Sequence, residues 1–183
     1  LKSQPYTIAD VFDKIFQGIA SGGDKFFSLK LIESISNEIG LFYSEILGKE
    51  VKLEFSFLKP LIKGNQISKY QPVIVTNYIL FPYSVENGKA VPMSFDTIKS
   101  EYPLTADYFI ENEVFLRGRE KGRFNNDKEW FLLSRNQGIS NVEIPKIMTQ
   151  EISFGCNMTY DTNGEFYHST TVYSFVKNKK YSV

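Results

Sequence analysis

The residues with the clearest chemical potential lie in a short loop of small side chains near the start of the sequence. In the stretch FQGIASGGDKFF, Ser21, Gly22 and Gly23 stand between two apolar segments, and Lys25 follows them. Glycine lets a backbone come close to a large ligand, and unhindered amides beside a hydroxyl can bind a phosphate group. The loop is therefore a candidate anion site. A plain tight turn is the open alternative, because glycine often marks only a turn.

Two later stretches, LIKGNQISKY and WFLLSRNQ, carry side chains that suit the edges of nucleic-acid bases. Arginine pairs well with the major-groove edge of guanine, and asparagine or glutamine with that of adenine. Both stretches can also be ordinary polar loops, which collect such residues whatever their role. The candidate side chains are Lys63, Asn65 and Gln66 in the first stretch and Arg135, Asn136 and Gln137 in the second.

Cations gather in one further run, although the chain as a whole is neutral. Lysine plus arginine and aspartate plus glutamate both number 21, which argues against a simple binder of polyanions. The segment RGREKGR nevertheless holds Arg117, Arg119, Lys121 and Arg123, and a second basic run, KNKK, lies near the end. The first run could grip a phosphate backbone. It could also be the solvated end of a helix, where cations suit the helix dipole.

Signs of enzymatic chemistry are few. The sequence contains no phosphate-binding P-loop, no dinucleotide fingerprint after a strand and no nucleophile elbow. One cysteine, Cys156, and one histidine, His168, exclude an intrachain disulfide and a metal cage of nitrogen and sulfur ligands. Glu50 and Lys52 have the spacing found in metal-dependent nucleases, but no second carboxylate is visibly paired with them. We predict no catalytic and no metal-binding residue. A nuclease and a protein-interaction module, the latter suggested by 16 Phe and 11 Tyr, stay open as alternatives.

The pattern of apolar residues predicts many short strands and a few helices. This order indicates an α+β fold with a twisted, mostly antiparallel β-sheet core, hairpins and a few helices. Leu31, Ile32, Ile35 and Ile39 have a helical spacing, which leaves the stretch around them ambiguous. The expected elements are a short helix over 8–12 capped by Thr7, strands at 14–20, 25–29 and 51–55, a central strand within 72–83, helices within 94–123 with Pro103 opening the longer one, strands from 146 onward, and hairpin turns at Gly48-Lys49, Asn87-Gly88 and Asn163-Gly164.

Taken in order, seven stretches resemble the TaqI-like C-terminal specificity domain. This is the target-recognition domain of adenine-specific DNA methyltransferases, and the version found in fused Type II restriction-modification enzymes is the most similar. Each motif alone is weak, but seven in sequence cover nearly the whole chain. The stretches are KIFQGIASGGDKFFSL, EFSFLKPLIKGNQISKY, YILFPY, YPLTADYFIENEVFLRGREKGRF, WFLLSRNQ, IPKIMTQEIS and NMTYDTNGEFYHSTTVYSF.

The resemblance implies one DNA target-recognition domain over residues 1–183, with 31–47 as a variable insertion. It implies that the domain contacts duplex DNA and positions the target adenine for a methyltransferase domain of the same polypeptide. The implied contacts to the DNA backbone come from Ser21, Gly22, Gly23, Lys25, Lys63, Arg117, Arg119, Lys121 and Arg123. Bases would be read by Asn65, Gln66, Arg135, Asn136 and Gln137.

The resemblance also implies where catalysis lies. The Asn-Pro-Pro-Tyr motif of the catalytic domain is absent here, so this chain is expected to have no methyltransferase activity and to bind no cofactor itself. S-adenosylmethionine, and Mg²⁺ if a nuclease is present, would belong to the parent protein. Ser21 stands where the family more often has threonine, and the hydroxyl is kept. The chain begins without methionine or an apolar leader and has no membrane-length apolar stretch, so we expect a cytoplasmic piece of a longer protein.

Overall fold

A computed structural model describes residues 5–86, 89–135 and 139–181 of the chain. Strands dominate these residues, and the helices are short. In chain order the elements are α1 (Ile8–Val11), β1 (Phe12–Gln17), α2 (Asp24–Phe27), β2 (Ser28–Ser34), β3 (Ile39–Ser44), β4 (Lys49–Glu54), β5 (Leu58–Ile62), β6 (Asn77–Leu80), β7 (Tyr83–Glu86), β8 (Lys89–Pro92), α3 (Phe95–Glu101), α4 (Pro103–Glu111), α5 (Glu113–Gly122), β9 (Lys146–Gln150), β10 (Met158–Asp161), β11 (Tyr167–His168) and β12 (Val172–Lys177).

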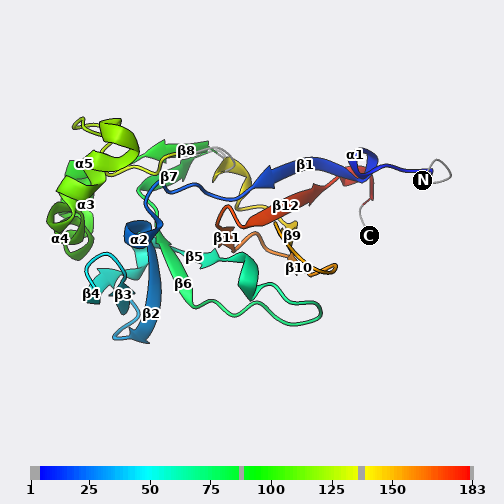
Figure 1. Cartoon of the computed structure of the whole chain (residues 1–183), viewed down its shortest axis with the longest axis horizontal. Coiled ribbons are helices and arrows are strands. Elements are labelled where there is room, and N and C mark those ends of the chain that lie inside the picture. The colour runs from blue at the N-terminus through cyan, green and yellow to red at the C-terminus, as the bar shows by residue number, and fades with distance from the viewer. Residues whose placement is uncertain (1–4, 87–88, 136–138, 182–183) are drawn as a thin grey trace.

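Two larger sheets lie next to each other along the long axis of the molecule (Figure 1). The six-stranded sheet has the order β11-β5-β6-β2-β3-β4, the four-stranded sheet has the order β1-β12-β9-β10, and β7 pairs with β8. All strand pairs are antiparallel except β11 with β5. This arrangement confirms the predicted α+β class with a mostly antiparallel sheet core.

The larger core lies between the six-stranded sheet and helices α3, α4 and α5, which cover one of its faces (Figure 1). Aromatic rings fill much of this core. Phe26 and Phe27 from α2 are both fully buried, and Phe26 stacks on Tyr108 with ring centroids 4.8 Å apart. Because aromatic rings bury large apolar areas, the loop that precedes α2 is held against a rigid body.

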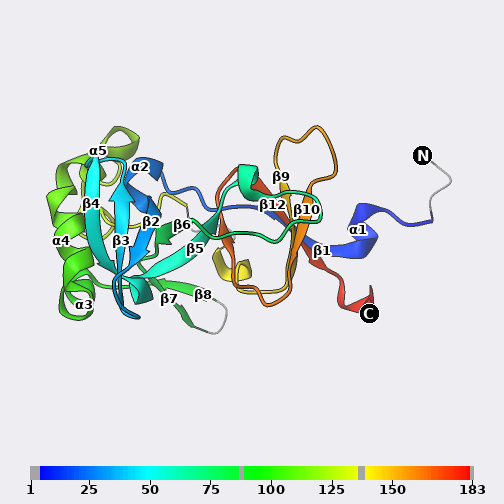
Figure 2. The same cartoon turned by 90° about the horizontal axis from the view of Figure 1, so that it is seen from below.

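A smaller core lies under the four-stranded sheet. It contains Ile62, Ile67, Met148 and Val172, with half-buried side chains from the segment after Ile67 packed against it. In Figure 2 that segment crosses in front of the sheet, on the face that carries Met148. The opposite face of the sheet is turned outward.

Several sequence predictions are correct at the level of single elements. Thr7 is the N-cap of α1, and Asp10 completes its capping box. Pro103 is the first residue of α4, and Gly48, with φ +63°, lies in the turn between β3 and β4. The predicted central strand is real but shorter, since only β6 within 72–83 pairs in the sheet. The Asn87-Gly88 turn lies outside the described residues.

Elsewhere the structure settles an ambiguity or corrects a prediction. The stretch around Leu31, which the sequence left ambiguous, forms strands β2 and β3, because β2 pairs on both sides, with β3 and β6. Residues 25–27, the first part of the strand predicted over 25–29, belong instead to the helical turn α2. Gly164 does lie in a turn, with φ +73°, but the turn links different sheets, since β11 pairs with β5 and not with β10. Residues 31–47 contribute the buried Phe42, and their variability between relatives stays a prediction.

Candidate nucleic-acid interface

The small-residue loop that follows β1 is tightly folded. Ser21 is only 3% exposed, and its hydroxyl donates to the Asp24 carboxylate and accepts the Gly23 N–H at 3.1 Å. Both capacities of the hydroxyl are therefore used inside the loop, which corrects the predicted phosphate contact by Ser21. Gly22 is exposed, with φ +70°, and a Cβ on it would lie 2.6 Å from the Cβ of Ser134. Glycine is thus required there by both its backbone conformation and its close approach.

Arg119 is the most deeply placed of the predicted cations. It is 5% exposed, and its guanidinium donates to the backbone carbonyls of Ser21 at 3.1 Å, Trp130 at 2.8 Å and Leu132 at 2.9 Å. Burial lowers the pKa of Arg119 to about 10, so it stays charged at neutral pH. With Leu116 O, which accepts from Nε at 3.0 Å, the guanidinium is bound to four buried carbonyls and is not available to a DNA backbone. The predicted contact by Arg119 is therefore corrected to a structural role that ties three segments together.

The three remaining members of the basic run differ in their ion pairs and in their exposure to solvent. Arg117 is bound to Glu113 at 2.7 Å and to Asp127 at 2.8 Å, and these hydrogen bonds raise its pKa. Arg123 is exposed and pairs with Glu120 at 2.9 Å. Lys121 is exposed, and no ion pair involves it in the part of the chain that the structure describes.

The regular helix predicted across this run ends early. Arg119 has ψ 147°, and Glu120 and Lys121 have φ +49° and +60°, so the chain makes a left-handed turn before Gly122 at φ +84°. Left-handed backbone is costly for residues with a Cβ. Here it is held by the carboxylate of Glu120, which accepts a hydrogen bond from Ser134. The turn presents Lys121 and Arg123 to solvent.

Backbone hydrogen bonds join the three loop regions that the sequence singled out. On one side, the small-residue loop forms hydrogen bonds with the segment that contains Arg135. On the other side, it forms a hydrogen bond with the segment β11–β12. That segment is in turn hydrogen-bonded to the end of β5 and to the loop after it. The bonds are Arg135 N to Ala20 O at 3.2 Å, Ser134 N to Ser21 O at 3.0 Å, Ile19 N to His168 O at 2.8 Å, Ser169 N to Ile62 O at 3.0 Å and Gly64 N to Thr171 Oγ1 at 2.9 Å.

This ladder, hereafter the loop ladder, passes through residues 168–171, which the sequence analysis did not assign to the site. In Figure 2 helix α2, the end of α5 and the short helical turn after β5 all lie toward the upper edge of the molecule. Hydrogen bonds therefore link the three predicted loop regions to one another, with the β11–β12 turn between two of them.

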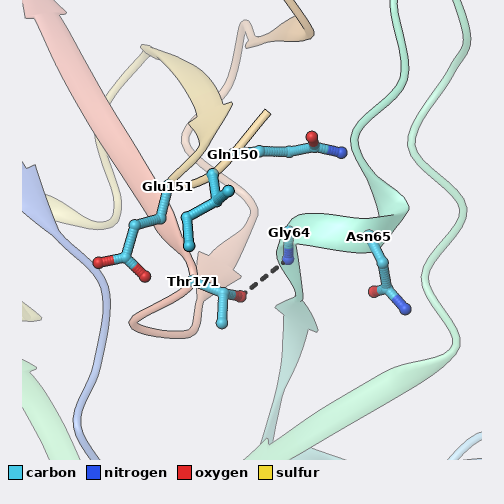
Figure 3. A pocket seen from close by; sticks show the side chains of 6 residues that line it. Gly64, Asn65, Gln150, Glu151 and Thr171 are labelled. Atoms are coloured by element: carbon cyan, nitrogen blue, oxygen red, sulfur yellow. Dashed lines mark hydrogen bonds between the residues drawn. The ribbon is translucent and has the colours of Figure 1, made fainter. Parts of the chain in front are cut away.

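A shallow hollow of about 330 Å³ opens beside the helical turn after β5 (Figure 3). Asn65 on this turn is exposed, and its side chain makes no hydrogen bond to another described residue. Gln66 is different, because its Nε2 donates to Ile74 O at 2.9 Å and its Oε1 accepts the Lys63 N–H at 2.8 Å. Base reading by Gln66 is therefore corrected to a structural role that shapes the loop, while Lys63 is half-buried beside it.

The hollow also contains residues that the sequence analysis missed. Gln150, Glu151 and Ile152 enter it from the end of β9, and Thr171 from the β11–β12 turn (Figure 3). Gln150 Nε2 donates to Ile67 O at 2.8 Å, which ties the two walls together. In the sequence, the only signal for Gln150, Glu151 and Ile152 was their place near the end of a predicted strand. A search for cations does not select these residues.

The remaining predicted contacts are either exposed residues or residues outside the described part of the chain. Lys25 is exposed and lies 3.8 Å from Glu45, a distance at which a solvated pair is weak. Arg135 is exposed at the edge of the loop ladder. Asn136 and Gln137 lie outside the described residues. The candidates that the structure leaves exposed are Lys25, Asn65, Lys121, Arg123 and Arg135.

Features of catalytic sites are scarce among residues 5–86, 89–135 and 139–181. Glu50 and Lys52, the nuclease candidates, are exposed on β4, the edge strand of its sheet. No group of three or more His, Cys, Asp or Glu side chains in these ranges could hold a metal ion. In the same ranges, no helix combines the length and apolarity that a membrane crossing needs.

Comparison with known proteins assigns no function to the chain. No protein-family model matches the chain, and no curated protein matches it significantly.

Proposed function

We propose that this chain is the DNA-recognition module of an adenine-specific DNA methyltransferase or a Type II restriction-modification enzyme. The loop ladder is the observation that supports this proposal most strongly. It joins the small-residue loop, the arginine segment and the loop after β5, which are far apart in the sequence. Such convergence gives a surface from which several loops could follow one duplex.

The exposed side chains on this surface fall into the two classes that DNA recognition needs. Lys25, Lys121 and Arg123 suit phosphate oxygens, whose contacts hold register without reading sequence. Arg135 and Asn65 are placed on loops and suit base edges. Asn136 and Gln137, next to Arg135 in the sequence, are further candidates for base reading.

Catalysis belongs, in this proposal, to a separate methyltransferase domain of the same polypeptide. That domain would use S-adenosylmethionine to methylate an adenine turned out of the stack. The present chain would act as a binding module and not as an enzyme. Its zero net charge means that it binds duplex weakly on its own, with the catalytic domain supplying further contacts.

Selection of duplexes from a random pool, followed by binding to the selected sequence, tests the proposal. We expect Arg135→Ala to relax the preference at one base pair, at a cost of about 1–3 kcal/mol. Lys121→Ala should weaken binding to all duplexes alike and reduce the log-log salt slope by about 0.9. Lys52→Ala, which removes an exposed cation on β4, is the matched control and should change neither.

Three outcomes of this experiment would contradict the proposal. If the wild-type chain enriches no sequence at low salt, a DNA-recognition role is wrong. If Lys52→Ala lowers binding as much as Lys121→Ala does, the chain binds DNA only through its general charge. Magnesium-dependent cleavage of the duplex that disappears in Glu50→Ala would instead support the nuclease alternative.

One observation favours protein contact as a second function. Ile15, Phe175, Ile147 and Tyr160 face one another across the four strands of the smaller sheet, on the outward face. Ile15 is 49% and Tyr160 55% exposed. Exposed apolar surface of this kind marks interaction sites, and the methyltransferase domain is the partner that we propose for it. Ile15→Lys with Tyr160→Lys should reduce self-association of the isolated chain in sedimentation and leave duplex binding unchanged.

A further inference from the structure

The loop between β9 and β10 carries its apolar side chains outward. Ile152 is 86% exposed, and Phe154 is fully exposed. The rest of the loop is polar, with Ser153 and Asn157 on either side of the apex. Ile152 and Phe154 together make this tip an exposed apolar feature on an otherwise polar loop, and exposed apolar surface of this kind is available to a ligand.

The apex that holds Phe154 is shaped by local hydrogen bonds. Ser153 Oγ donates to Gly155 O at 2.7 Å, and Asn157 Nδ2 donates to Ser153 Oγ at 3.0 Å. At the base of the loop, Thr149 Oγ1 donates to Asn157 O at 2.9 Å, and Glu151 N donates to Thr171 O at 2.9 Å. The last bond anchors the loop to the β11–β12 turn, which is part of the loop ladder. These hydrogen bonds hold the loop that carries the Phe154 ring in one conformation.

The location of the loop connects it to the candidate DNA surface. Ile152 lines the same hollow as Gly64 and Asn65 (Figure 3). In Figure 2 the β9–β10 loop projects toward the same upper edge as α2 and the end of α5. The loop that carries Phe154 therefore borders the hollow that contains the candidate base-reading residue Asn65, through Ile152.

We propose that Phe154 is a wedge that inserts between neighbouring base pairs of the bound duplex, with Ile152 supporting it from the loop below. This inference rests on the proposed function. Proteins that deform DNA use phenylalanine and other apolar side chains in this way, unstacking one step and kinking the helix. Opening a step lowers the cost of turning a base out of the stack, which the proposed partner domain requires.

The experiment uses the full chain and the duplex that it selects from a random pool. Each adenine is replaced in turn by 2-aminopurine, whose fluorescence rises when it leaves the stack. We expect the wild-type chain to raise the fluorescence several-fold at one position. Phe154→Ala should reduce this rise to less than about a third while changing the Kd by less than about tenfold, since the phosphate contacts stay. Phe154→Trp should keep the rise.

Val114→Ala is the matched control, because Val114 is 90% exposed on α5 and its truncation removes a similar exposed apolar group. It should leave the fluorescence unchanged. If the wild-type chain selects no duplex, the proposed function and the wedge both fall. If it binds the duplex without a rise, or if Phe154→Ala keeps the full rise, only the wedge is wrong. Self-association that disappears in Phe154→Ala, with the rise intact, would assign the tip to a protein contact.

Discussion

At the scale of single residues, Arg119 shows how burial decides the role of a charge. Its guanidinium donates to the carbonyls of Ser21, Trp130 and Leu132 and packs 4.1 Å from the ring centre of Phe124. Removing it leaves buried carbonyl oxygens without donors. We expect Arg119→Ala to lower the free energy of unfolding by about 3 kcal/mol in urea titrations. Arg119→Lys should recover only part, because an ammonium cannot reproduce the planar fork.

Arg123→Ala is the control for this prediction. Arg123 is an exposed cation four residues away, and it pairs with Glu120 at the surface. Its loss should change stability by less than about 0.5 kcal/mol. Equal stability of the two alanine variants, together with a loss of duplex affinity only in Arg119→Ala, would contradict the structural role.

Residue types alone did not predict which of the candidate side chains are committed to the fold and which are exposed. The sequence grouped Arg119 with Lys121, and Gln66 with Asn65, since their neighbours in the sequence are alike. In the structure one member of each pair is held by hydrogen bonds and the other is exposed. Hydrogen-bond partners from other segments, such as the carbonyl of Trp130, decide which side chain is held. The local sequence around each candidate does not reveal these partners.

At the scale of elements, the left-handed turn after α5 couples stability to the candidate interface. Lys121 has φ +60°, which costs an L-residue about 1–2 kcal/mol, and glycine removes that strain for an entropic cost of about 0.5–1 kcal/mol. Lys121→Gly should therefore stabilise the chain by about 0.5–1 kcal/mol in urea while reducing the salt slope of duplex binding by about 0.9. Lys121→Ala separates the effects, because it removes the same charge and keeps the strain. If Lys121→Gly gains no stability over Lys121→Ala, the backbone is not strained there.

The elements themselves were predictable to different degrees. Local signals such as the Thr7 cap and Pro103 gave the helix starts correctly. The helical spacing around Ile32 left that stretch ambiguous. In the structure Ile32 and Ile35 are about half exposed, and pairing on both sides makes β2 a strand. Pairing between distant strands is a property of the whole sheet, and a window of a few residues does not contain it.

At the scale of the whole molecule, the β11–β12 segment connects the two large sheets. β11 pairs with β5 in the six-stranded sheet, and β12 lies within the four-stranded sheet. The loop ladder crosses this connection, since His168 O accepts the Ile19 N–H and Ser169 N donates to Ile62 O. The sequence singled out the three loop regions, but it did not indicate that a turn beside the single histidine joins them by hydrogen bonds. Their meeting depends on contacts more than a hundred residues apart along the chain.

This connection gives the stability of the molecule a predictable pH dependence. His168 is fully buried, its Nε2 and the Ser174 hydroxyl share a hydrogen bond of 2.6 Å, and the Phe16 ring lies 5.5 Å away. Burial, and then the charge of Lys146, lower the pKa of His168 to about 4, although Asp161 opposes this effect. The unfolded chain has the ordinary histidine pKa of about 6.5 and so takes up the proton first as the pH falls.

Stability should therefore be fully present above about pH 6.5 and decline between that pH and about pH 4. From pH 7 to pH 5 the expected loss from this one group is about 2 kcal/mol, measured by urea unfolding at each pH. His168→Asn should be less stable at pH 7 but lack this part of the decline, because its side chain does not titrate. The same carboxyl groups titrate in both proteins, so the difference between their pH profiles isolates His168. Parallel profiles over this range would mean that the buried histidine is protonated as readily in the folded chain as in the unfolded one.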